Sequence, residues 1–186
     1  MAFEAPAFYS NQEDFRQLHS RLKQTACPHC QEIGNLNLHG YLCGYPDSAA
    51  AQKVIRGRRA FCSNRGRRRG CGRTFSVLAA NIIKRCIVGA GRLWRFLKNA
   101  AAGLSKIQAF KTSVHGFSAT SCYRIWNRFL LSQSRLRVLL SWFCPAPVLP
   151  GARAPIIQTI MHLKSAFKNA ACPVAAFQKH FQTQFF

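Results

Sequence analysis

Acidic residues are scarce in this 186-residue sequence, and they stop early in it. The chain has 5 Asp plus Glu against 27 Lys plus Arg, which gives a formal net charge of +22. The acids are Glu4, Glu13, Asp14, Glu32 and Asp47. All but three of the basic residues follow them, so residues 48–186 contain no carboxylate side chain to act as a counter-ion. Charge of one sign at this density favours a polyanion, and nucleic acid is the expected partner.

The same scarcity excludes several kinds of catalysis. Metal-dependent nucleases and transposases with acidic active sites need clustered carboxylates to hold divalent ions, and the chain cannot assemble such a cluster after residue 47. Hydrolysis by paired carboxylates is excluded for the same reason. The sequence also lacks a P-loop, the His-hydrophobic-His pair of a tyrosine nuclease, and a Ser or Cys with an evident base. We therefore expect a protein that is not an enzyme.

Long apolar runs are missing as well. No stretch approaches the roughly 18 to 20 apolar residues of a membrane span, and the N-terminal residues lack the basic and apolar regions of a signal peptide. We expect a cytoplasmic, nucleoid-associated protein with no membrane partner. Nine cysteines in a reducing compartment then indicate metal ligands and buried thiols, not disulfides.

The hydrophobic content of 48% indicates a chain that folds. Its patterns divide it into four segments, and the expected fold class is α+β, mostly α. The segments are an N-terminal helix in 1–24, a small zinc ribbon in 25–80, a tri-helical helix-turn-helix in 81–142, and a linker with C-terminal helices in 143–186.

The first two segments carry one helix and three short strands. The helix is predicted over about 11–23, and the capping-box pattern from Ser10 to Glu13 begins it. The strands are predicted at 36–42, 53–61 and 73–77. Three short strands make too small a core to be stable alone, so this module needs a metal.

The predicted metal ligands follow the spacing C-x2-C-x31-C-x8-C and are Cys27, Cys30, Cys62 and Cys71. Two thiolates separated by two residues can turn onto one tetrahedral zinc ion while backbone N–H groups support the sulfurs. Cys43, His29 and His39 are alternative ligands. The spacing of the second pair exceeds the usual two to four residues.

The insert between the second pair of cysteines is rich in arginine. It reads SNRGRRRG, with glycines near its ends, as expected for a knuckle loop enlarged into a finger that reaches a phosphate backbone. The predicted nucleic-acid contacts in this part of the chain are the arginines of the second strand, of the finger and at the start of the third strand: Arg56, Arg58, Arg59, Arg65, Arg67, Arg68, Arg69 and Arg73.

Four segments of the sequence carry a family resemblance. CPHC, LNLHGY, RGRRAFCSN and GCGRTFS resemble the zinc-ribbon segments at the N-termini of insertion-sequence transposase proteins. In those proteins a CPxC knuckle, a strand with HG(Y) and a C-x-RTF knuckle precede a helix-turn-helix. The resemblance covers about residues 25–130. It implies Zn²⁺ as the cofactor and a role in DNA binding for a transposon or similar mobile element.

Helical spacing dominates after residue 88. Two helices are predicted around 93–101 and 107–114, and a third from Ser118 to about residue 142. Helices separated by tight glycine turns are what a helix-turn-helix requires, because its last helix enters the major groove. An ordinary amphipathic helix with a solvated basic face is the alternative.

The third of these helices has an apolar face and a polar face. Arginine pairs with guanine and asparagine with adenine, so Arg124 and Asn127 are the predicted base contacts. Thr120, Ser121 and Arg128 share that polar face and are predicted to lie nearer the phosphates.

The C-terminal segment contains more phenylalanine than two short helices need. The residues are Phe167, Phe177, Phe181, Phe185 and Phe186. They either fold back over the preceding helices or form a docking surface for another protein or a second copy of the chain.

Two functions therefore remain after sequence analysis. The favoured one is a non-catalytic protein that grips duplex DNA through a zinc ribbon and a helix-turn-helix, as an accessory or regulator of a mobile element. The alternative is a structural RNA-binding protein of a ribonucleoprotein complex, which holds RNA by charge and aromatic stacking.

Overall fold

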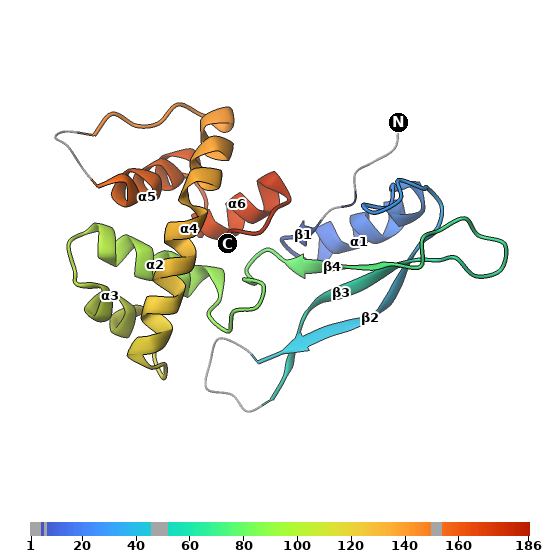
Figure 1. Ribbon diagram of the computed structural model, residues 1–186, viewed down its shortest axis with the longest axis horizontal. Helices are drawn as coiled ribbons and strands as arrows, with labels where there is room; N and C mark the ends of the chain where they lie inside the picture. Colours follow the sequence, from blue (N-terminus) through green and yellow to red (C-terminus); the bar gives the residue numbers. More distant parts are fainter. Residues whose placement is uncertain (1–4, 6, 46–51, 150–153) are drawn as a thin grey trace. The chain divides into compact units, whose positions relative to one another are not determined.

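A computed structural model describes residues 5, 7–45, 52–149 and 154–186 of the chain (Figure 1). These residues form six α-helices, one 3₁₀-helix and a four-stranded mixed sheet, which confirms the predicted α+β class. The chain divides into two compact units, Met1–Ala80 and Asn81–Phe186. The first unit contains the sheet, and the second contains only helices.

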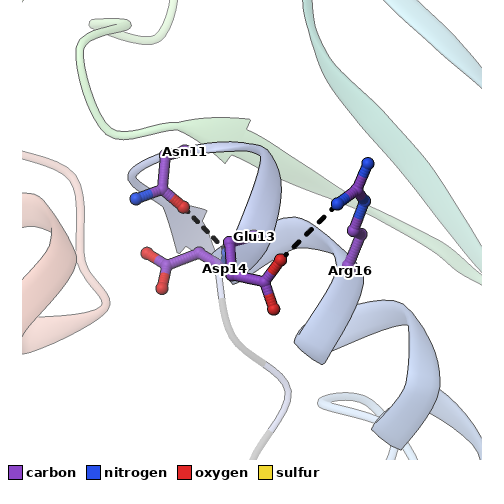
Figure 2. A network of polar contacts seen from close by, with 4 residues as sticks. All are labelled: Asn11, Glu13, Asp14 and Arg16. Atoms are coloured by element: carbon purple, nitrogen blue, oxygen red, sulfur yellow. Dashed lines mark hydrogen bonds and ion pairs between the residues drawn. The ribbon is translucent and has the colours of Figure 1, made fainter.

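The first unit contains the helix α1 (Gln12–Arg21), and a 3₁₀-helix (Leu22–Gln24) follows it directly. The helix cap is Asn11, whose side-chain oxygen accepts a hydrogen bond from the Asp14 N–H at 2.8 Å (Figure 2). The Asp14 carboxylate accepts one from the Ser10 N–H at 3.0 Å. Glu13 forms an exposed ion pair with Arg16 at 3.6 Å (Figure 2). The prediction of Ser10 as the cap is wrong by one residue, because Asn11 and Asp14 supply the capping pair.

The sheet has the strand order β1-β4-β3-β2. Its strands are β1 (Phe8–Tyr9), β2 (Leu36–Gly44), β3 (Val54–Cys62) and β4 (Thr74–Ala79). The last three are the predicted strands, joined in antiparallel pairs. The expectation of only three strands is wrong, because β1 pairs in parallel with the edge of β4. Two residues are too few to show an alternating pattern in the sequence.

The core of the first unit is small and lies between α1 and one face of the sheet. Leu18 and the adjoining Leu22 pack there against Leu36 and Val77. Two of the predicted ligands, Cys27 and Cys62, belong to the same cluster, and both are fully buried. Two of the four predicted ligands are therefore part of the core that holds α1 on the sheet.

The second unit consists of α2 (Ala90–Ala101), α3 (Lys106–Ser113), α4 (Ala119–Phe143), α5 (Pro155–Ala166) and α6 (Pro173–Phe181). All five contribute side chains to one apolar core. The three helices predicted after residue 88 are present. Gly103 (φ +103°) follows α2, and Gly116 (φ +81°) lies in the turn between α3 and α4.

The C-terminal phenylalanines belong to this core. Phe177 and Phe185 are fully buried, and the Phe185 ring stacks on Phe129 of α4 with 5.9 Å between centroids. Phe167, Phe181 and Phe186 pack around the same cluster. The prediction that these residues fold back over the preceding helices is confirmed.

Candidate metal centre and basic surfaces

The four predicted ligands converge at one end of the sheet. The Sγ atoms of Cys27, Cys30, Cys62 and Cys71 all lie within 4.8 Å of one another. The Cys27–Cys71 sulfur distance is 3.8 Å, and the Cys30–Cys62 distance is 3.7 Å. A tetrahedral ion with metal–sulfur bonds of about 2.3 Å requires sulfurs roughly 3.8 Å apart. The donor set and its geometry therefore fit one metal ion.

The first knuckle, at Cys27 and Cys30, is shaped by three backbone hydrogen bonds. The Cys27 N–H donates to the Glu32 carbonyl at 3.0 Å, and the Gln31 N–H donates to the Cys27 carbonyl at 2.9 Å. The His29 N–H points at the Cys27 sulfur at 3.4 Å. A hydrogen bond from the Glu32 backbone lowers the pKa of the Cys30 thiol to about 7, which favours the thiolate that binds metal.

The second knuckle explains the long spacing between Cys62 and Cys71. The Gly70 N–H donates to the Ser63 carbonyl at 3.1 Å, so these two residues face each other across the base of the loop. The Cys71 N–H donates to the Cys62 sulfur at 3.4 Å, as in an ordinary knuckle. Ser63 and Gly70 are thus the two inner residues of a regular C-x2-C knuckle, and residues 64–69 are an insertion between them.

Electrostatics favours a cation in this cluster. Burial raises the pKa of the Cys62 thiol to about 12, because removal from water penalises the thiolate. Four thiolates packed at these distances also repel one another. A bound dication compensates both effects, since a coordinated thiol is deprotonated outright.

The alternative ligands lie outside the cluster. Cys43 is exposed on β2, and among the described residues the four cysteines are the one group of three or more His, Cys, Asp or Glu side chains close enough to share a metal ion. His29 contributes its backbone N–H. The His39 ring packs beside Phe61 with 5.9 Å between centroids.

Gly70→Ala is expected to disrupt the second knuckle. A Cβ at this position would lie 2.2 Å from the Ser63 carbonyl oxygen and 2.8 Å from the Cys62 sulfur. Neither atom can move without displacing the predicted metal ligands. We therefore expect the free energy of unfolding to fall by about 1–3 kcal/mol and metal retention to weaken. Thermal unfolding and the metal content of the purified variant measure both effects.

Gly66→Ala is the matched control in the same loop. Gly66 has φ +59°, and a Cβ there would meet no atom within 4 Å. The substitution should lower the free energy of unfolding by only about 1 kcal/mol, because alanine is strained in a left-handed backbone conformation. The metal content should not change. Equal metal loss in both variants would contradict the role assigned to Gly70.

The insertion carries the arginine finger, which we define as residues 64–69. Its four arginines are all exposed: Arg65, Arg67, Arg68 and Arg69. The Arg68 N–H donates to the Arg65 carbonyl at 3.3 Å, which closes a turn within the finger. The loop runs beyond the ends of the strands (Figure 1, green). Four guanidinium groups are therefore presented together on one tethered loop.

The other predicted arginines of this unit differ in exposure. Arg59 and Arg73 are exposed. Arg58 is half-buried, and its guanidinium lies over the rings of Tyr41 and Phe15 at 4.0 and 5.7 Å. Arg56 is also half-buried. Of these four arginines, the structure thus leaves two accessible: Arg59 on β3, and Arg73, which directly precedes β4.

The polar face of α4 is open over most of its predicted contacts. Thr120, Arg124 and Asn127 are exposed, about one helical turn apart. Ser121 is half-buried, and its hydroxyl lies 3.3 Å from that of Ser118, the N-cap of the helix.

Arg128 differs from the rest of that face. Its guanidinium donates to the carbonyls of Lys84 and Phe186 at 3.3 and 3.1 Å, and it lies 4.6 Å from the centroid of the Phe186 ring. These contacts connect α4 to two other segments of the helical unit. We therefore assign Arg128 to holding the unit together and not to the phosphate-facing surface.

A row of apolar residues on α4 is exposed, which sequence reasoning missed. Leu131, Val138 and Trp142 are 87%, 50% and 77% exposed, and their spacing of seven and four residues places them on one face. Apolar periodicity predicts a buried face, but it cannot tell which stripe a neighbouring helix covers. This exposed apolar row thus lies on α4, whereas the C-terminal phenylalanines are packed in the core.

Comparisons with known proteins add no assignment to this geometry. No protein-family model matches the chain, and no curated protein or solved structure matches it either. In the described ranges, no helix is both long and apolar enough to cross a membrane.

Proposed function

We propose that this chain is a non-catalytic nucleic-acid-binding protein whose four-cysteine site holds Zn²⁺. The observation that carries the proposal is the arginine finger, which presents four exposed guanidinium groups from a loop closed at its base by the metal knuckle. Arginine forks match phosphate oxygens in two parallel hydrogen bonds. Closing the loop at its base lowers the entropy lost when these side chains bind.

The charge of the chain supports the same partner. Zinc with four thiolates changes the formal charge by −2, from +22 to +20, so the metal leaves the field nearly intact. No carboxylate side chain follows residue 47 to neutralise it. A polyanion is the ligand that such a field attracts.

Duplex DNA is the favoured nucleic acid, because the second unit offers a surface for base reading. We propose that α2, α3 and α4 act as a helix-turn-helix, with Arg124 and Asn127 reaching base edges and Thr120 and Ser121 nearer the backbone. The protein would then be a DNA-binding accessory or regulator of a mobile element, in line with its resemblance to insertion-sequence transposases. A structural RNA-binding protein is the second candidate, and the exposed arginines favour it equally.

Arg124→Ala tests the reading surface. For duplex DNA selected from a random pool by the metal-loaded protein, we expect binding about 10³-fold tighter than for random duplex, and the substitution should lower that ratio by ~10-fold. Arg95→Ala is the control, because Arg95 is an exposed arginine of the same unit on α2. It should leave the ratio unchanged.

The outcome also separates the two candidates. Equal affinity for selected and random duplexes, with preference for folded RNA, would replace the DNA-reading function by the RNA-binding one. Absence of binding to every nucleic acid at about 50 mM salt would overturn the proposal as a whole, because electrostatic binding is strongest there.

A further inference from the structure

The sheet has a second face, opposite the one that packs on α1, and the strand register defines what it carries. Asn37, Phe61 and Thr74 are opposite one another across β2, β3 and β4. Side chains alternate along a strand, so these three point away from the core residues Leu36 and Val77. They form the first cross-strand row of this face.

A second row lies beside the first. Arg59 is paired with Ser76 of β4, and the register shift in β2 between Leu38 and Tyr41 leaves His39 and Gly40 together opposite Arg59. This shift is a β-bulge at Gly40, whose φ of +83° suits a glycine. The bulge brings the His39 ring to 5.9 Å from the Phe61 ring, with 48° between the planes.

The composition of the six-residue face is unusual for a sheet that awaits a protein layer. These six residues offer two rings, one guanidinium, one amide and two hydroxyls, whereas the packed face is lined with Leu36, Val77 and the cysteine cluster. Toward β1 this second face changes character, because Leu78 and its partner Phe8 are buried. His39, Arg59 and Thr74 are exposed, and Phe61 is half-buried. The Arg65 guanidinium of the finger lies 6.0 Å from the centroid of the Phe61 ring.

The charge around this face has one sign. No residue of β2, β3 or β4 is acidic. The Lys23 ammonium donates to the Asn37 side-chain oxygen at 2.5 Å, which brings a second cation to the edge of the first row. Two effects lower the pKa of Lys23: partial burial, which is the larger, and the positive charge of Arg68. An anion near these cations would relieve their repulsion.

We infer that this face binds an unpaired nucleotide of single-stranded nucleic acid. Its base stacks on Phe61 and His39, Arg59 hydrogen-bonds to the base edge, and the flanking phosphates lie toward Lys23 and the finger. The Asn37 amide is held by Lys23 and by the Asn35 carbonyl, so it supports the edge of the platform. In a duplex both faces of a base are covered by its neighbours, so an aromatic platform selects unpaired bases. The inference deepens the proposed function and rests on it, because it assumes a nucleic-acid ligand.

Phe61→Leu tests this platform with the full-length, metal-loaded protein. The probes are a 12-nucleotide single-stranded DNA, its RNA equivalent, and the duplex of the same sequence, each labelled for fluorescence anisotropy. Leucine keeps apolar bulk but removes the ring, so affinity for the single strands should fall about tenfold, while duplex affinity stays within about twofold. Phe61→Tyr keeps the ring and should bind like the parent protein.

His39→Ala is the second variant, because Phe61 precedes a metal ligand and His39 lies further from the knuckle. It should weaken single-strand binding several-fold with full metal content. The DNA and RNA probes distinguish the two sources of an unpaired base. If the parent protein binds the duplex but neither single strand, this inference is overturned and the proposed function stands. If the parent protein binds neither the duplex nor the single strands, the proposed function is overturned. Unchanged single-strand affinity in both variants would also overturn the inference.

Discussion

Cys27→Ser is expected to release the metal and unfold residues 7–80, while the helical unit stays folded. Cys27 is fully buried and belongs both to the sulfur cluster and to the core that holds α1 on the sheet. Structural zinc supplies about 10–16 kcal/mol in small domains, which is as large as the total stability of most domains. The second unit has an apolar core of its own, so it has no need of the metal.

Metal analysis and hydrogen exchange measure this result. The variant should retain no stoichiometric zinc, and amides of β2, β3 and β4 should exchange freely while those of α2 and α4 stay protected. Cys43→Ser makes the same chemical change at an exposed thiol outside the cluster, and it should behave as the parent protein. A folded, metal-free Cys27→Ser sheet would show that the four cysteines are ordinary thiols.

Replacing the four finger arginines by alanine is expected to cause the largest loss of nucleic-acid affinity. Each phosphate contact to duplex DNA contributes about 0.9 to the slope of log K against log salt, so four lost contacts should flatten that slope by about 3 to 4. Affinity at low salt should fall by at least ~10²-fold. Metal content should not change, because the finger lies outside the Ser63–Gly70 closure of the knuckle.

The charge-preserving variant with four lysines is the matched control. It keeps four cations on the loop, so its salt slope should match that of the parent protein, although the loss of bidentate hydrogen bonds lowers affinity at every salt concentration. Titrations from about 50 to 200 mM salt distinguish the two variants. An alanine variant with the parental slope would remove the finger from the binding surface.

Local sequence patterns predicted most of the elements, because their causes are local. Ser118 is the N-cap of α4, as its position before an apolar-periodic run indicates. The helix stop at Gly103 follows from a residue with φ +103°. The CPxC pair predicted a metal site that needs a second pair of ligands. Cys62 and Cys71 were preferred to Cys43, His29 and His39, and the structure brings the four sulfur atoms together.

The features that sequence reasoning missed depend on contacts between distant residues. Nothing near Arg128 in the sequence shows that its guanidinium meets carbonyls at Lys84 and Phe186. The exposure of Trp142 depends on which face of α4 the other helices cover. The long spacing of the second cysteine pair depends on the hydrogen bond between Ser63 and Gly70, which face each other across the base of the loop.

The closure of the second knuckle beneath the insertion makes the finger a separable module. A loop that leaves and re-enters between two hydrogen-bonded residues can change its length at a cost that grows only slowly, since each doubling costs about 0.6 kcal/mol of closure entropy. Its charge can change as freely, because residues 64–69 supply no sulfur to the metal. Selection or design can therefore change the length and charge of this loop without altering the four-cysteine scaffold that supports it.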